Sequence, residues 1–253
     1  MIRRLFAIAL ALAATMPVHA DALTAEAIVQ RAHEAAGGSV WKRPKTLHLT
    51  GQATIYRDGL AANAMRLDHY EMWRVFPAWN DAAHGANGKF RLEARAGERV
   101  VIRQSFDGTD TWDANGKVPQ AQASREAGEN YGFGIIRFAL DKGFRLARLP
   151  DDQVEGHPSH AVRVTDPTGG ETTFWIDRDS FAIRKVGFDT PRGWHERIYS
   201  DFYRVEPSGF MQPGRVRLYY RGALSNDITW TDAVVDGPIA DEVFVLERAA
   251  NSE

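Results

Sequence analysis

Residues 171–188, ETTFWIDRDSFAIRKVGF, carry the pattern that decides the fold. Phe174 and Ile176 alternate with more polar neighbours, which is the period-two spacing of a β-strand with one buried face. Asp177-Arg178-Asp179 then supplies residues that favour a tight turn, and a second apolar strand follows directly. The stretch therefore predicts an antiparallel β-hairpin.

The same pattern extends in both directions from this hairpin. From residue 45 onward, short alternating segments are separated by turn residues rich in Asp, Asn and Gly. Crossover helices between the strands are absent from the pattern, which excludes a parallel α/β sheet. The chain is thus predicted to be mainly β with minor α, as one large antiparallel sheet, curved or partly closed. The predicted strands are 45–56, 66–76, 89–95, 98–106, 109–113, 144–149, 153–156, 159–165, 171–177, 181–188, 194–205, 214–221 and 227–235.

Two helices are expected beside the strands. Leu23 to Ala36 has Thr24 as a candidate N-cap and Gly37-Gly38 as a stop signal. Residues 131–144, YGFGIIRFALDKGF, have helical spacing and are apolar on almost every side. Such a helix needs neighbours on more than one face, so we expect it to cover the sheet as a short lid.

The apolar side chains of the strands concentrate on one concave face rich in aromatic residues. The chain has 7 Trp, 13 Phe and 7 Tyr. A barrel of about eight strands can be filled by its own side chains, whereas more strands favour a cavity, so both options remain open. The residues expected to line a cavity are Trp73, Phe174, Phe202, Leu218, Tyr220 and Trp230 from the sheet, and Phe133 and Ile136 from the lid helix.

The N-terminal sequence and the composition indicate where the protein is located and which partners and kinds of site are excluded. Arg3 and Arg4 precede an apolar run that ends at Val18-His19-Ala20, the pattern of a secretory signal peptide cleaved after Ala20. The remaining residues, 21–253, are expected to form a single domain in the periplasm. The net charge of −2 carries no basic block, which argues against a nucleic-acid partner. The absence of cysteine excludes disulfides, a cysteine nucleophile and a lipid-anchored N-terminal Cys.

No pattern points to catalysis. The sequence lacks the GxSxG, HExxH and phosphate-loop motifs. His157 and His160 form an HxxH pair, but Gly156 and Pro158 place it at a turn, where a solvated hairpin is the simpler interpretation than a metal site. We therefore predict no catalytic residues, no metal and no cofactor, and a protein that is not an enzyme.

Several short segments, taken in order, resemble the LolA-like superfamily of periplasmic proteins that sort outer-membrane lipoproteins or bind lipids. Phe106-Asp107-Gly108-Thr109-Asp110-Thr111-Trp112 is similar to that family's DGxxxW hairpin. The stretch 173–185, the aromatic strand 199–203 and the closing segment 238–244 resemble later elements of the family, and 72–77 resembles a strand that ends in proline.

The resemblance implies a half-open antiparallel β-barrel with an N-terminal helix and a helix at its mouth. It also implies a carrier or binding protein that holds lipid or lipoprotein acyl chains in a hydrophobic cavity. Inner- or outer-membrane proteins are candidate partners, and a monomer is expected. Two alternatives stay open: a protein-interaction or sensor module of the same fold, favoured by a filled barrel, and an enzyme without a recognisable motif, favoured by ionisable groups clustered in the cavity.

Overall fold

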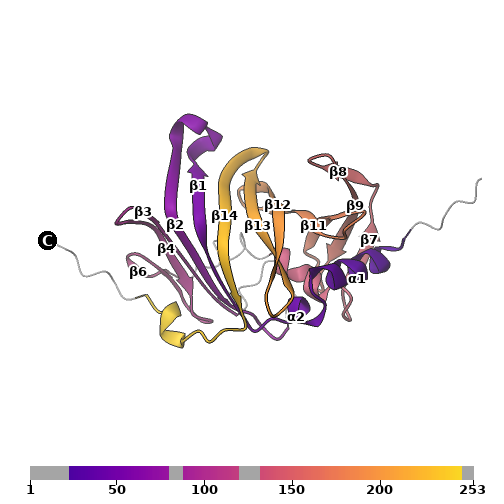
Figure 1. The fold of residues 1–253 in the computed structure, drawn as a ribbon, viewed down its shortest axis with the longest axis horizontal. Helices are drawn as coiled ribbons and strands as arrows, with labels where there is room; N and C mark the ends of the chain where they lie inside the picture. Colours follow the sequence, from indigo (N-terminus) through magenta and orange to yellow (C-terminus); the bar gives the residue numbers. More distant parts are fainter. Residues whose placement is uncertain (1–22, 80–87, 120–131, 247–253) are drawn as a thin grey trace, which may run out of the picture.

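The structure, a computed structural model, describes residues 23–79, 88–119 and 132–246 (Figure 1). Its main element is one sheet of 14 strands in the order β6-β5-β4-β3-β2-β1-β14-β13-β12-β11-β10-β9-β7, with β8 paired to β9. The strands are β1 Thr46–Tyr56, β2 Ala64–Val75, β3 Lys89–Ala96, β4 Arg99–Phe106, β5 Thr111–Asp113, β6 Gly116–Lys117, β7 Arg145–Arg148, β8 Asp152–Val154, β9 His157–Thr165, β10 Glu171–Asp177, β11 Ile183–Thr190, β12 Gly193–Val205, β13 Phe210–Tyr220 and β14 Ala223–Val235.

The hairpin of residues 171–188 forms as the sequence predicts. Phe174 of β10 lies opposite Val186 of β11, and both side chains are fully buried. The turn is held by the Asp177 carboxylate, whose Oδ1 accepts hydrogen bonds from the backbone N–H groups of Asp179 at 3.1 Å and Ser180 at 2.9 Å. The short polar side chain thus satisfies the donors that the turn leaves free.

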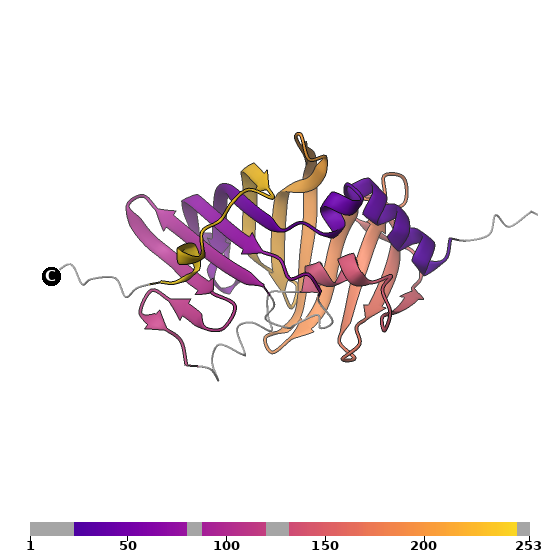
Figure 2. The same cartoon turned by 90° about the horizontal axis from the view of Figure 1, so that it is seen from below.

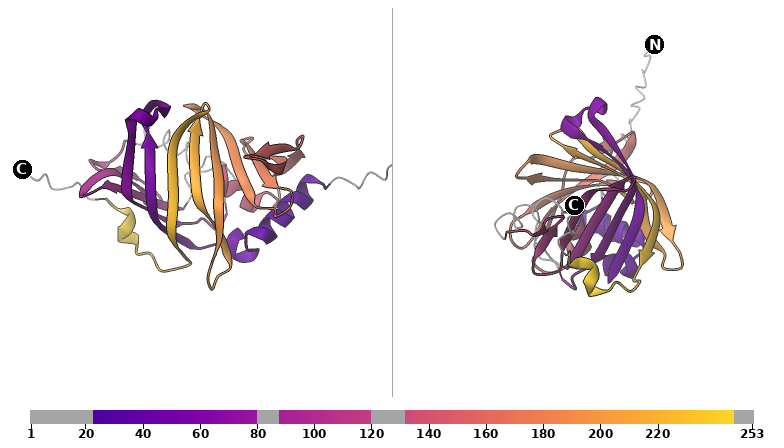
Figure 3. Two further views of the ribbon diagram at one scale, coloured as in Figure 1. Left: turned by 45° about the horizontal axis from the view of Figure 1, so that its top comes forward. Right: turned by 90° about the vertical axis from the view of Figure 1, so that its left-hand side faces the viewer.

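The sheet is antiparallel throughout and is not closed, which confirms the predicted half-open architecture. It twists and curls around one face (Figure 3). The first and last strands, β1 and β14, pair with each other in the middle of the sheet. The pairing register shifts at Gly51 on both sides of β1, so the strand bends there and the alternation along β2 is interrupted.

A pronounced close approach explains why glycine stands at position 51. A Cβ atom on Gly51 would lie 2.1 Å from the Thr229 carbonyl oxygen and 2.9 Å from the Trp230 Cα of β14. Both contacts are with backbone atoms, so no side-chain rotation relieves them. The two central strands can therefore approach this closely only with glycine here.

Helices pack on the concave face of the sheet (Figure 2). Helix α1 (Ala25–Ala36) is capped by Thr24, whose hydroxyl accepts the Ala27 N–H at 3.2 Å, and it ends at Gly37, where φ is +125°. Both ends match the sequence prediction. The short helix α2 (Ser39–Lys42) follows and buries Trp41.

The apolar segment 131–144 forms a shorter element than predicted. It contains the 3₁₀ helix η3 (Gly132–Phe138), followed by turns up to β7. Gly134 lies inside this helix rather than at its boundary, and a glycine in a short helix disfavours its continuation as a regular α-helix. Ile135 and Ile136 are fully buried, so the segment covers the sheet as expected.

The remaining 3₁₀ helices lie away from this face. η1 (Arg57–Gly59) and η2 (Ala61–Asn63) join β1 to β2. η4 (Asp241–Phe244) packs on the outer face of β3 and β4, where the Ser105 hydroxyl donates a 2.7 Å hydrogen bond to the Phe244 carbonyl. Among the described residues, no helix has the length and apolar character needed to cross a bilayer.

Candidate binding cavity

The concave face is filled at one end of the sheet and hollow at the other. Beside β7–β11, side chains of α1 and η3 pack against the strands and form the continuous core. Beside β1–β4 and β12–β14, a cavity of about 580 Å³ remains between the sheet, α2 and η3. Its apolar walls include Trp41, Leu47, Leu49, Ile55, Tyr70, Met72, Phe76, Phe90, Leu92, Ile102, Tyr199, Phe210, Met211, Val216, Leu218, Tyr220, Ile228 and Trp230.

The structure brings together only some of the residues predicted to line a cavity. Leu218, Tyr220 and Trp230 lie in its wall. Phe174 and Ile136 are fully buried in the packed half of the core and line no cavity. The side chain of Phe133 lies outside the part of the chain that the structure describes.

The predicted position of Trp73 is wrong. Tyr70, Met72 and Arg74 of β2 face the cavity, so Trp73, at the alternate position, points to the opposite face of the sheet. There its ring stacks on His48 at 5.0 Å and borders a separate hollow with Pro238 and Val243. The sequence pattern separates the two faces of this strand but does not say which of them is concave.

Phe202 lines a second, smaller hollow of about 230 Å³ beside the main cavity. The two spaces share Trp41, Tyr199, Met211 and Pro213, so these four side chains separate them. The second hollow is lined mostly by apolar side chains, with Ala35 and Ala36 at the end of α1 on its far side. The apolar space therefore continues towards α1.

The sequence analysis missed four arginines in the cavity wall: Arg74, Arg137, Arg192 and Arg197. None of the described residues that line the cavity is Asp, Glu or His. Two of the arginines could have been found from strand alternation, because Arg74 and Arg197 share strand faces with Met72 and Tyr199. Arginine side chains bind anions well but exchange protons poorly at neutral pH, so this wall suits binding better than acid–base chemistry.

Arg197 is held in place by a buried histidine. The Arg197 Nε–H donates to His195 Nε2 at 2.9 Å, and the opposite ring atom, Nδ1, donates to the Tyr219 carbonyl at 3.0 Å. Burial, together with the nearby Arg197 charge, lowers the pKa of His195 to about 3. The imidazole is therefore neutral at physiological pH, so Nε2 has a lone pair that accepts the hydrogen bond from the Arg197 Nε–H.

A second buried histidine ties η3 to α1. His33 Nε2–H donates a 2.7 Å hydrogen bond to the carbonyl of Ile136, and burial lowers the pKa of His33. This bond fixes the backbone directly before Arg137. The position of Arg137 in the cavity wall thus depends on a contact between two helices far apart in the sequence.

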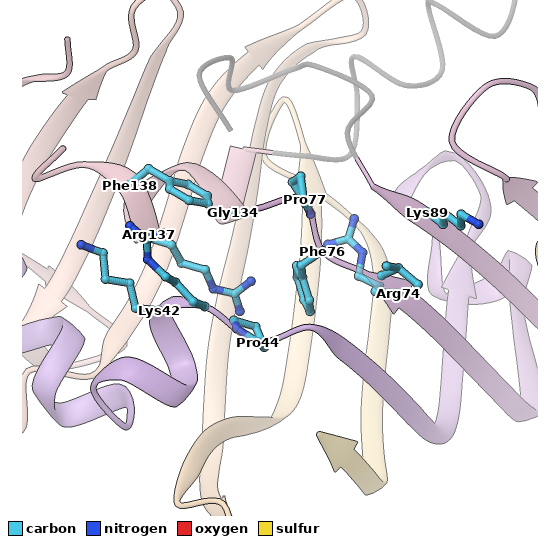
Figure 4. Close-up of a pocket in the computed structure, with 11 residues that line it drawn as sticks. Lys42, Pro44, Arg74, Phe76, Pro77, Lys89, Gly134, Arg137 and Phe138 are labelled. Atoms are coloured by element: carbon cyan, nitrogen blue, oxygen red, sulfur yellow. The ribbon is translucent and has the colours of Figure 1, made fainter. Parts of the chain in front are cut away.

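Arg137 lies where the cavity meets a small outer hollow (Figure 4). Its side chain is only 4 % exposed, and its guanidinium carbon lies 4.8 Å from the Trp41 ring centroid and 4.5 Å from that of Phe76. In Figure 4 the Phe76 ring lies between the guanidinium groups of Arg137 and Arg74. Burial, reinforced by the charge of Arg74, lowers the pKa of Arg137 to about 9.

Because of the two buried histidines, we expect the folded protein to lose stability in mild acid. Both have pKa values below the ordinary 6.5, so below pH 6.5 the unfolded chain binds protons that the folded chain does not. We expect the free energy of unfolding to fall between pH 6.5 and 5 by up to about 1.4 kcal/mol per pH unit for each histidine. For His195 the loss continues down to about pH 3. Urea unfolding across this pH range measures it.

The control separates these histidines from the carboxylates, which bind protons mainly below about pH 4.5. His195→Gln should reduce the slope between pH 6.5 and 5, because it removes a group that takes up a proton in the unfolded chain but not in the folded one. Equal slopes in the wild type and in His195→Gln would contradict this account.

An open, curled antiparallel sheet with helices on its concave face and an apolar cavity beneath them defines the LolA-like fold, and this chain has it. A LolA superfamily protein from Nitrosomonas europaea has a TM-score of 0.53 at 14% identity, with 89% of this chain and 99% of that chain covered. A DUF1329 family protein from Desulfovibrio piger has a TM-score of 0.51 at 11% identity, with 87% and 97% covered. No protein-family model matches the sequence, and a search of curated proteins gives no match.

Proposed function

We propose that this protein is a periplasmic binding protein that carries an apolar ligand, the acyl chains of a lipid or lipoprotein, in the cavity between its sheet and helices. The observation that carries the proposal is the cavity of about 580 Å³ with a mainly apolar wall. Ligand sites in proteins typically enclose about 300–1,000 Å³. Burial of an acyl chain there releases about 25 cal/mol per Å² of apolar surface removed from water.

The proposal places the protein in the periplasm as one domain, residues 21–253, after removal of a signal peptide at Ala20. We assign it a binding role rather than a catalytic one, because the described wall holds arginines without the carboxylates or imidazoles that proton transfer needs. Displacement of η3 would open the cavity. This 3₁₀ helix is short, and a hydrogen bond from the His33 ring to the Ile136 carbonyl connects it to α1.

The first test looks for the ligand itself. Native mass spectrometry of protein purified gently from the periplasm should show a bound lipid, and delipidated protein should then bind a fluorescent fatty acid. If no lipid is found and the delipidated protein binds neither a fatty acid nor its ester, the carrier proposal fails.

A variant that fills the cavity makes the second test. Leu218→Trp adds an indole to the cavity wall and should weaken fatty-acid binding at least about tenfold, a loss of about 1.4 kcal/mol. Stability should change little, since the ring enters space that is already empty. Tyr219→Trp, the next residue on β13 but on the other face of the sheet, is the matched control and should bind as the wild type does. Equal binding by both variants would place the ligand elsewhere.

A further inference from the structure

We propose that the ligand is an anionic amphiphile, whose carboxylate or phosphate group is bound by Arg137 while its acyl chain occupies the apolar cavity. The inference rests on the proposed function, and it names the chemical class of the ligand. It depends on three observations: the burial of Arg137, the lack of an acidic partner for it among the described residues, and its position between two hollows.

Arg137 is buried, and the part of the chain that the structure describes holds no counterion for its charge. Among the residues that the structure describes, no carboxylate forms an ion pair with it, and its Nε atom is buried without a hydrogen-bond acceptor. A buried charge normally requires a counterion or several hydrogen bonds, because its removal from water is costly. The guanidinium is therefore prepared for an anion that the described part of the chain does not provide there.

The aromatic contacts of Arg137 do not satisfy this need. Trp41 and Phe76 stabilise the positive charge through their π faces. A guanidinium also has five N–H donors directed outwards in its plane, and aromatic faces accept these weakly. A carboxylate or phosphate can accept two of them in parallel, which is the geometry that arginine favours.

Two of the other cations around the outer hollow have acidic partners and lie nearer its rim than Arg137 does. The hollow is lined by Lys42, Arg43, Arg74, Lys89 and Arg137, without an acidic residue among the described lining. Lys42 pairs with Asp141 at 3.3 Å, and Lys89 pairs with Asp241 at 2.6 Å. These pairs hold their charges at the rim, whereas Arg137 lies at the inner end, next to the cavity (Figure 4).

The position of Arg137 indicates an amphiphile rather than a free anion. Arg137, Arg74 and Phe76 line both the cationic outer hollow and the large apolar cavity. An anionic group at Arg137 would therefore have apolar space on one side and positive charge on the other. This arrangement fits a molecule with an acidic head and a long hydrocarbon tail.

The test compares cis-parinaric acid with its methyl ester, which has the same tail but no charge. Delipidated wild-type protein should bind the acid about ten- to a hundredfold more tightly than the ester, the range of a hydrogen bond to a charged group. Arg137→Gln should make the two affinities similar, because it weakens binding of the acid and leaves binding of the ester unchanged. Arg145→Gln removes an exposed charge from β7, away from the hollow, and should keep the wild-type preference.

Each outcome bears on a different claim. If the wild type binds acid and ester equally, or Arg137→Gln keeps the preference, the anionic-head proposal is overturned while the carrier function stands. If neither probe binds, the carrier function itself fails. Binding of the ester by Arg137→Gln would show that the variant is folded. If the variant does not fold, the comparison of acid and ester on the wild-type protein tests the anionic-head proposal by itself. Displacement of parinarate by millimolar inorganic phosphate would indicate a free-anion site and would also overturn the proposal.

Discussion

Replacing Phe174 with alanine is expected to lower the free energy of unfolding by about 3–5 kcal/mol, the usual cost of truncating a buried phenylalanine. Phe174 is fully buried in β10, between β9 and β11, in the half of the concave face that α1 and η3 cover. Close-packed neighbours cannot collapse into the space that the ring leaves, so a void remains.

The same truncation at Leu218 should cost much less, about 1 kcal/mol. Leu218 is only partly buried and already borders an empty cavity, so its removal enlarges a space instead of creating one. Urea unfolding of Phe174→Ala and Leu218→Ala, followed by fatty-acid binding, measures both effects. A loss at Leu218 as large as that at Phe174 would mean that the cavity is filled by side chains in solution.

Replacing Gly51 with alanine is expected to destabilise the protein by at least about 3 kcal/mol, or to prevent folding, because the added methyl group meets the backbone. The new Cβ would lie 2.1 Å from the Thr229 carbonyl oxygen. Relief of this contact requires β1 and β14 to move apart at the centre of the sheet. Trp230 in the cavity wall would move with them.

Gly222→Ala is the matched control. Gly222 also requires glycine, with φ at +77°, but a Cβ there meets nothing within 4 Å. Only the left-handed backbone would be strained, at about 1–2 kcal/mol. Soluble yield and urea unfolding of both variants provide the comparison. If Gly51→Ala is no less stable than Gly222→Ala, the close approach of the central strands is not a constraint.

The sequence predicts the strands of this fold well because their signals are local. All thirteen predicted strands are present, and within the residues that the structure describes the two-residue strand β6 is the one that the sequence does not predict. Asp177, for example, marks the end of β10 by accepting hydrogen bonds from the backbone of the turn that follows. The 131–144 segment was predicted less accurately, since Gly134 lies within a short 3₁₀ helix that tertiary packing stabilises.

The cavity is harder to predict because it depends on the curvature of the sheet. Alternation correctly places Trp73 opposite Tyr70 and Met72, yet curvature decides that Trp73 is on the convex side. Curvature depends on features such as the register shift at Gly51, where β1 pairs both with its neighbour β2 and with β14, which is distant in the sequence. Arg137 could not be found by any strand pattern, because it comes from the helix that covers the sheet.

The pairing of β1 with β14 has a consequence for the order of assembly. β1–β6 pair neighbour to neighbour, as do β9–β13, while β7 and β8 both pair with β9. In the described sheet these two groups are joined through β14, the last strand in the sequence. The cavity wall includes residues of both groups, so its two sides do not face each other until β14 has paired with β1 and β13. Such long-range pairing is slow to form. A ligand that contacts both walls of the cavity can therefore bind only after the whole sheet has formed.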